Sequence, residues 1–379
     1  MKVEFYRHSL SEEDIQRLVT VCRGLFLTTG KEVKEFEERF AAYLGARYCV
    51  GLTSCTAGLH IALLALDIGP GDEVITSPMT FAATSNTILF TGATPVFVDV
   101  EPATGLLDLD LLERAITPRT RAIIAVHLYG QMVDMRRLKE IAERRGLKII
   151  EDCAHAIESE RDGIRPGQLS DASCFSYYAT KNITCGEGGS VVTNSAELND
   201  RLRLLRQHGL TSNAADRYAG AYKHWDIELL GWKYNMTNLQ AAMLIGQIDR
   251  IDSLWEQREA VSRRYEAGFS GVDGVQFPIV LPGVKSARHL FTIWVAPSRR
   301  DDVLADLQSR QVGVAVNYRA VHLLKLYQER MHLPRGTFPV TERIGDSTLT
   351  LPLYPSLPEV EQDYVIESVK ASVAMTARV

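Results

Sequence analysis

The 379-residue sequence has no apolar run that approaches the roughly 20 residues needed to cross a bilayer. It also lacks a strong excess of charge of either sign, since its net charge is −5 and its acidic and basic residues are interspersed. Nucleic-acid-binding proteins and polybasic membrane proteins usually carry a basic patch, so neither kind of partner is expected. The first eight residues contain no apolar core of a signal peptide.

The sequence is also poor in cysteine motifs and nucleotide fingerprints. Its six cysteines (22, 49, 55, 153, 174 and 185) form no C-x-x-C pair. We therefore expect reduced thiols in a cytoplasmic protein, and neither a disulfide framework nor a metal site. Neither G-x-G-x-x-G nor G-x-x-x-x-G-K-[ST] occurs, which excludes the two common phosphate-binding glycine loops.

What is present is a strong α/β pattern. Strand-like runs at 48–51, 73–77, 94–98, 122–127 and 147–150 alternate with helical patterns. Such alternation predicts a mostly parallel sheet flanked by helices, with ligands at the carboxyl ends of its strands. The pattern changes to α+β after residue 271. We expect a large domain over residues 1–254, which includes the N-terminal helices, and a smaller C-terminal domain over 255–379.

Three features could act together at such a strand edge. The strand at 48–51 leads through Thr53-Ser-Cys-Thr56 into a helix, and a helix start rich in hydroxyls suits a phosphate, although simple capping is the alternative. Asp152 ends another strand. Lys181 lies between an aromatic strand (173–178) and a glycine cluster (186, 188 and 189), where partial dehydration would lower its pKa and make it a nucleophile.

Pyridoxal phosphate requires this combination of groups. Its aldehyde condenses with a lysine amine, its phosphate suits a helix start, and a carboxylate keeps its ring nitrogen protonated. Phe81, at the end of a further strand, could stack on the ring, although a core position is equally compatible with the sequence. Most lysines are solvated surface charges, so Lys181 alone would not carry the hypothesis.

The sequence resembles the DegT-type nucleotide-sugar aminotransferases, which belong to the aspartate-aminotransferase (fold type I) superfamily. The matching segments run in family order over nearly the whole chain: Thr53-Ser-Cys-Thr-Ala-Gly58, Gly71-Asp-Glu-Val-Ile-Thr-Ser-Pro-Met-Thr-Phe81, Gly92-Ala-Thr-Pro-Val-Phe-Val-Asp99, Val126-His-Leu-Tyr-Gly130, Glu151-Asp-Cys-Ala-His155, residues 176–189, Gly231-Trp-Lys-Tyr-Asn-Met-Thr237 and Leu351-Pro-Leu-Tyr-Pro355. Three segments, at 181–184, 231–235 and 317–322, are most similar to enzymes that aminate C4 of UDP-4-keto sugars, such as the synthase of UDP-4-amino-4-deoxy-L-arabinose.

The resemblance implies a role for each candidate residue. Lys181 would form the Schiff base with pyridoxal phosphate and move the proton during transamination. Asp152 would hold the pyridinium N–H, and His155 would lie near the ring hydroxyl, although a satisfied core histidine is the alternative. The remaining cofactor contacts would be phosphate binding by Cys55, Thr56 and Ser176, and stacking by Phe81.

The resemblance also implies a homodimer with its active site at the interface, where residues 231–237 reach the partner's cofactor. Many relatives carry Asn and Arg at two polar positions where this chain has Lys233 and Asn235, and we favour Asn235 as the phosphate contact. The expected substrates are a nucleotide-linked keto sugar and L-glutamate. Thr28, Thr29, Arg319 and His322 would contact the sugar substrate, and the loop at 211–222 would contribute to specificity.

Three alternatives remain open at this stage. The chain could aminate C3 of a dTDP-, UDP- or GDP-linked keto sugar, since the preference for C4 rests on subgroup similarity alone. A pyridoxal-phosphate-dependent sugar dehydratase is less favoured, because such relatives replace the Schiff-base lysine by histidine and Lys181 is present here. A non-catalytic regulator is disfavoured by the presence of Lys181, Asp152 and Ser176 together. Lipopolysaccharide or other glycan biosynthesis is the expected setting.

Overall fold

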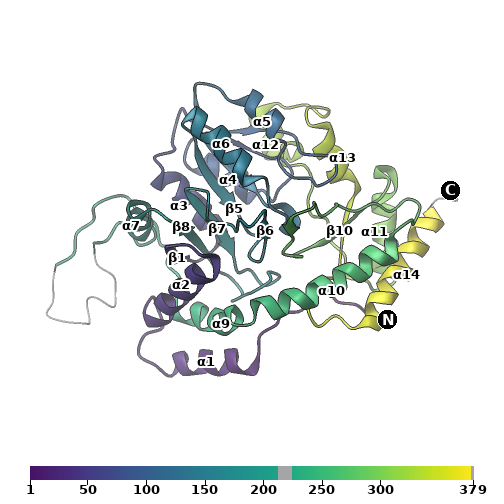
Figure 1. The fold of residues 1–379 in the computed structure, drawn as a ribbon, viewed down its shortest axis with the longest axis horizontal. Helices are drawn as coiled ribbons and strands as arrows, with labels where there is room; N and C mark the ends of the chain where they lie inside the picture. The colour runs from purple at the N-terminus through teal and green to yellow at the C-terminus, as the bar shows by residue number, and fades with distance from the viewer. Residues whose placement is uncertain (212–223, 377–379) are drawn as a thin grey trace.

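A computed structural model describes residues 1–211 and 224–376. Over these residues its centre is a seven-stranded sheet (Figure 1). The strands lie in the order β1 (Tyr48–Leu52), β8 (Gly189–Thr193), β7 (Ala172–Ser176), β5 (Lys148–Asp152), β4 (Thr120–Val126), β2 (Glu73–Thr76) and β3 (Thr94–Phe97). All of them run in one direction except β8, which is antiparallel to both of its neighbours. The predicted mostly parallel sheet is confirmed.

Helices cover both faces of this sheet. Consecutive strand residues point to opposite faces, so Ile123 and Ile149 pack in one core while Ile124 and Ile150 pack in another. One face is covered by α3 (Cys55–Ala65), α4 (Ala83–Phe90) and α7 (Ala196–Leu205). The other face is covered by α2 (Lys31–Leu44), α5 (Leu109–Ala115), α6 (Met135–Arg145) and α9 (Asn238–Ile248), and α1 (Glu12–Cys22) packs outside α9.

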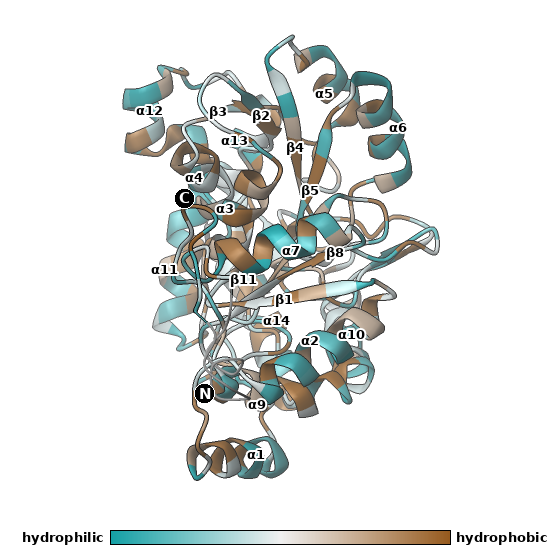
Figure 2. Ribbon diagram, turned by 90° about the vertical axis from the view of Figure 1, so that its left-hand side faces the viewer, coloured by the Kyte–Doolittle hydropathy of each residue, from teal (hydrophilic) through white to brown (hydrophobic). Residues whose placement is uncertain are grey.

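Local sequence signals set the ends of several helices. The Asp134 side chain accepts a hydrogen bond from the Arg137 amide at the start of α6, and Gly146 ends this helix at a φ of 65°. Gly45 ends α2 in the same left-handed conformation, with a φ of 71°. In Figure 2, α6 is strongly hydrophilic on its outer side, whereas β5 beside it is largely hydrophobic. Both α2 and α6 therefore end at a glycine of the sequence.

The C-terminal part has its own hydrophobic core. It contains α10 (Ile251–Phe269), the antiparallel pair β10 (Phe291–Trp294) and β11 (Thr348–Leu351), α11 (Arg300–Ser309) and α14 (Glu359–Thr376). The segment at 313–316 forms only an isolated bridge between Ala315 and Thr350, because Thr348–Leu351 takes the place beside β10. Smaller elements are α12 (Lys325–Met331), α13 (Pro339–Ser347), and β6 (Glu160–Arg161) paired with β9 (Val284–Lys285).

The two-domain division stays a prediction. Helix α10 is continuous through the proposed boundary at 254/255, and Figure 1 shows it running from α9 towards α14. Val3, at the N-terminus, packs in the C-terminal core. Among the described residues, the helices are all too short or too polar to cross a membrane.

Candidate active site

A cavity of about 540 Å³ lies at the carboxyl edge of the sheet. Strands β1, β2, β4, β5 and β7 all end at this edge because they run in the same direction. The cavity lining combines predicted and unpredicted residues: Ser54, Cys55, Thr56, Phe81, Asp152, His155, Ser176, Lys181, His289 and Tyr318 are among them. The sheet topology therefore brings together groups that are far apart in the sequence.

Lys181 lies in the turn that follows β7, with its backbone N–H bonded to the Tyr178 carbonyl at 2.9 Å. Its Nζ lies 3.4 Å from Nε2 of His289. Burial lowers the pKa of Lys181 to about 8, and the nearby Cys55 and Asp152 oppose this effect only in part. A substantial fraction of the amine is therefore neutral near pH 8, which is the form that can attack an aldehyde.

Asp152 ends β5 and projects into the cavity with 7% of its surface exposed. Its Oδ2 accepts a hydrogen bond of 2.7 Å from Thr84, and its Oδ1 accepts one of 3.2 Å from the Ala154 amide. Thr84 in turn lies 2.8 Å from the Thr80 hydroxyl. These contacts fix the carboxylate while leaving lone pairs on Oδ1 for a ligand, which fits the ring N–H of a pyridinium.

The start of α3 forms the expected anion site. The Ser54 hydroxyl accepts the Ala57 amide at 3.0 Å, so the N–H groups of Cys55 and Thr56, which precede the first intrahelical bonds, remain for a ligand. Gly189 of β8 packs directly against this turn. A Cβ at this position would lie 2.3 Å from the Cys55 nitrogen, so only glycine permits the close approach.

His155 is a neutral acceptor and donor inside the cavity wall. Its Nδ1 accepts the Tyr129 amide at 3.2 Å, so Nε2 carries the hydrogen and donates to the Tyr318 hydroxyl at 3.0 Å. Burial, assisted by Lys181, holds the pKa of His155 well below its usual value. In this structure His155 is therefore a buried histidine with both ring nitrogens hydrogen-bonded. Its ring also lines the cavity.

Phe81 and Ser176 also reach the cavity. Phe81 is 61% exposed, and its ring centroid lies 5.9 Å from that of Tyr318. This exposure excludes the simple core role for Phe81 and leaves its face available for stacking. Ser176 is the last residue of β7 and pairs with Gly189, which places its side chain beside the start of α3.

Four residues predicted to contact the partner's cofactor or the sugar substrate lie outside the cavity of the single chain. The Asn235 amide donates to the Thr29 hydroxyl at 2.7 Å, and that hydroxyl donates to the Met236 carbonyl at 2.6 Å. Both side chains are buried, whereas Lys233 is exposed and Thr28 is partly buried. None of these four residues lines the cavity.

The structure also separates His322 from the cavity. Its ring is fully buried 4.8 Å from that of Phe338, and its Nε2 lies 3.0 Å from Glu342 Oε1. A sugar cannot reach this ring without displacing the packing around it. Arg319 is exposed and directly follows the cavity residue Tyr318. The loop at 211–222 lies outside the described residues except for Thr211.

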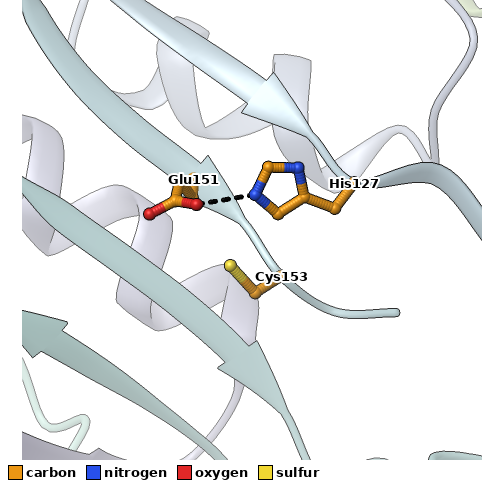
Figure 3. A group of neighbouring side chains, drawn as sticks. All are labelled: His127, Glu151 and Cys153. Carbon is orange, nitrogen blue, oxygen red and sulfur yellow. Dashed lines mark hydrogen bonds and ion pairs between the residues drawn. The ribbon is translucent and has the colours of Figure 1, made fainter. Parts of the chain in front are cut away.

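A second group of polar side chains lies behind the sheet edge, where His127, Glu151 and Cys153 converge (Figure 3). His127 Nδ1 accepts the Val133 amide, so its Nε2–H donates to Glu151 Oε2 at 2.7 Å. Burial alone would raise the pKa of Glu151, but hydrogen bonds from His127, Ser170 and Ser173 outweigh it and lower that pKa. Both His127 nitrogens are thus engaged, and the group links β4, β5 and β7.

Comparison with known proteins identifies the family. The model of the DegT/DnrJ/EryC1/StrS aminotransferase family matches residues 8–370. The chain belongs to this family. It is 39% identical over 368 residues to the spore coat polysaccharide biosynthesis protein SpsC of Bacillus subtilis, covering 95% of this chain and 94% of SpsC.

Solved structures of relatives agree with this identification. The PMP form of Spr1654 from Streptococcus pneumoniae superimposes with a TM-score of 0.94 at 32% identity, covering 99% of this chain and 100% of that one. PseC of Helicobacter pylori, an aminotransferase involved in pseudoaminic acid biosynthesis, gives a TM-score of 0.93 at 26% identity, with 99% and 100% covered. The chain is a sugar aminotransferase of fold type I that depends on pyridoxal phosphate.

Three groups in this site were not predicted from the sequence. Thr84 orients Asp152, Tyr318 faces both His155 and Phe81, and His289 contacts Lys181. Thr84 lies near the start of α4, which follows β2 and the loop that carries Phe81, so its distance from Asp152 depends on the order of the strands in the sheet. His289 and Tyr318 come from the C-terminal part, whose packing against the sheet no local pattern reveals.

Proposed function

We propose that this aminotransferase transfers the amine of L-glutamate to C4 of a UDP-linked 4-keto sugar. The observation that carries the proposal is the placement of the partly dehydrated Lys181 amine in one cavity with Asp152 and the start of α3. When bound there, pyridoxal phosphate supplies an electron sink for the substrate carbon that loses its proton. Lys181 is the residue that would bond to the cofactor.

Each residue of the chain then has a separate task. The amides of Cys55 and Thr56, with the Ser176 hydroxyl, would bind the phosphate, while the Asp152 carboxylate would hold a proton at the ring nitrogen. The Phe81 ring would cover one face of the cofactor, and His155 would border its hydroxyl edge. Nζ of Lys181 would carry the proton between the substrate carbon and the cofactor, a role that typically contributes ~10²–10⁴-fold to the rate.

Sequence similarity supports the choice of sugar. The segments at 181–184, 231–235 and 317–322 are most similar to enzymes that aminate C4 of UDP-4-keto sugars. The name of SpsC refers to spore coat polysaccharide biosynthesis, and PseC is described as an aminotransferase of pseudoaminic acid biosynthesis. We therefore place the reaction in glycan biosynthesis. The six free cysteines favour a reducing, cytoplasmic setting.

A panel of keto sugars tests this proposal. With L-[¹⁵N]glutamate and a UDP-4-keto sugar, we expect ¹⁵N at C4 of the product and one 2-oxoglutarate per amino sugar. We expect kcat/KM to exceed that for a dTDP-3-keto sugar by at least about tenfold. Nuclear magnetic resonance and mass spectrometry of the products provide the measurement. Nitrogen at C3 would instead show a C3 aminotransferase, and a deoxygenated product would show a sugar dehydratase.

We further propose a homodimer whose interface includes an exposed apolar surface beside the cavity. The residues that we propose for this surface are the exposed Phe81, Phe90, Ile227 and Leu230, of which Leu230 is 82% exposed. The segment that carries Leu230 continues to Trp232, whose ring packs 5.0 Å from that of His60. It also includes Lys233 and Asn235, one of which would reach the partner's cofactor phosphate. The exposed Lys233 is the freer of the two, since Asn235 is bonded to Thr29.

The dimer is tested by a charge placed on this apolar surface. Leu230→Asp should shift the wild-type dimer towards monomer, because association would bury the new carboxylate against apolar groups. Sedimentation equilibrium measures the dissociation constant, which we expect to rise by at least about tenfold. Leu25→Asp, at an 86% exposed site outside this surface, is the matched control. An unchanged dissociation constant for Leu230→Asp would remove this surface from the interface.

A further inference from the structure

A line of buried polar side chains extends from Lys181 away from the cavity. Nζ of Lys181 lies 3.4 Å from Nε2 of His289, and Nδ1 of His289 lies 2.9 Å from Oδ1 of Asn182. Asn182 in turn contacts Glu158, whose carboxylate faces Arg258 at 3.8 Å. His289, Asn182, Glu158 and Arg258 are each at least 95% buried. Buried polar groups are retained at a cost, so a connected series of them calls for a role.

Hydrogen bonding determines which nitrogen of His289 carries its hydrogen. Nδ2 of Asn182 donates to Glu158 Oε2 and to the Ala287 carbonyl, both at 2.8 Å. Because the amide nitrogen has two acceptors, the oxygen of Asn182 must be the atom that faces His289. An oxygen can only accept, so Nδ1 of His289 carries the hydrogen. Nε2 therefore presents a lone pair to Lys181.

The residues that fix the tautomer of His289 come from the part of the chain that forms the large sheet and from α10. Glu158 and Asn182 follow strands of the large sheet, whereas Arg258 belongs to α10. Nη2 of Arg258 donates to the Asn182 carbonyl at 2.8 Å. Burial, with Lys181 as the next contribution, holds the pKa of His289 well below its usual value, so the ring remains a neutral acceptor. Asn182 is thus fixed at both its side chain and its backbone.

We propose that His289 is a positioning residue that holds the free amine of Lys181 by accepting a hydrogen bond at Nε2, with Asn182 fixing its tautomer. The inference rests on the proposed role of Lys181 as the cofactor lysine. Lys181 can make this hydrogen bond with His289 when its amine is not bonded to the cofactor. In the same state the amine would move a proton. A neutral amine that donates one N–H to His289 keeps its own lone pair for the substrate.

The groups around Lys181 determine the direction in which replacing His289 should shift the pKa of Lys181. Among the described residues, Cys55, Asp152, His155 and His289 lie near Nζ, and of these four His289 is the one with a neutral acceptor within hydrogen-bonding distance, at 3.4 Å. The ammonium form donates more strongly than the neutral amine does, so losing the acceptor penalises the ammonium. Replacing His289 by an apolar ring should therefore lower the pKa of Lys181 further.

The test measures Lys181 directly in the full-length apoenzyme. An amine-reactive reagent such as trinitrobenzenesulfonate labels Lys181 at a series of pH values, and peptide mass spectrometry quantifies the label. We expect a wild-type midpoint near pH 8, and a midpoint lower by about one pH unit in His289→Phe. His289→Gln places an amide oxygen at the reach of Nε2 and should restore the wild-type midpoint. His8→Phe, at an exposed histidine, is the control.

Steady-state kinetics and a double-mutant cycle provide an independent readout. In His289→Phe we expect kcat to fall about 10–100-fold with a much smaller change in the KM for L-glutamate. Asn182→Ala should also lower the labelling midpoint of Lys181 and kcat. Combining it with His289→Phe should change neither quantity much further, because Asn182 acts through His289.

Two failures remain distinguishable. If pyridoxal phosphate protects Lys181 from labelling but the midpoint stays constant in His289→Phe, the positioning role is wrong and the proposed function survives. If the cofactor binds yet gives Lys181 no protection in the wild type, the role of Lys181 itself is wrong. A lower midpoint that His289→Gln does not restore would also overturn the acceptor role of His289.

Discussion

Lys181→Ala is expected to abolish turnover while leaving the fold intact. The variant loses the amine that would bond to the cofactor and carry the proton, so kcat should fall by at least about 10⁴-fold. Pyridoxal phosphate should still bind through the start of α3 and Asp152, but without the absorbance of a Schiff base. Stopped-flow spectroscopy of the glutamate half-reaction and steady-state assays provide the measurements.

A matched lysine variant separates this effect from a general loss of positive charge. Lys139 lies on α6, where its side chain is 40% exposed and pairs with Glu143 on the same helix. Lys139→Ala should retain the wild-type rate, since surface pairs of this kind contribute little. A Lys181→Ala enzyme within about tenfold of the wild-type rate would contradict the assignment.

Asp152→Asn is expected to have the second-largest effect. The substitution preserves the shape of the side chain and allows Thr84 to donate to its oxygen, but it removes the negative charge beside the ring nitrogen. Without that charge the pyridine proton is lost more readily, by roughly 1–3 pKa units for such a pair. We expect both half-reactions to slow by about 10²–10⁴-fold in single-turnover measurements.

The control for this variant is Asp134→Asn at the start of α6. Asp134 caps that helix and does not line the cavity, and asparagine is an equally good cap. Its single-turnover rates should equal those of the wild type. Equal rates in Asp152→Asn and the wild type would show that the carboxylate does not act on the cofactor.

The sequence predicted the part of the site that depends on strand ends. Asp152 and the turn before α3 each follow a regular apolar run, and parallel strands bring their carboxyl ends to one edge without further information. The glycine cluster after Lys181, which includes Gly189, was noted in the sequence as the flank of the lysine. In the structure Gly189 gives room for the Ser54–Cys55 backbone, because β8 is antiparallel and begins where β1 ends.

Contacts between distant elements could not be predicted in the same way. His289 lies beside Lys181 because α10, β10 and the loop before β10 pack against the sheet. Neither His289 nor Lys181 carries a local sequence signal for that contact. Similarly, His322 was expected near the substrate from family similarity. Its position follows from burial against Phe338 and from its hydrogen bond with Glu342, which only tertiary packing determines.

The most direct test of the central claim is borohydride reduction of the holoenzyme followed by peptide mapping. Reduction makes a Schiff base between lysine and pyridoxal phosphate permanent, so mass spectrometry identifies the lysine that carries it. The account predicts one cofactor per chain, attached to Nζ of Lys181, and loss of the label when L-glutamate is added before reduction. Attachment to another lysine, or a label that L-glutamate does not remove, would contradict it.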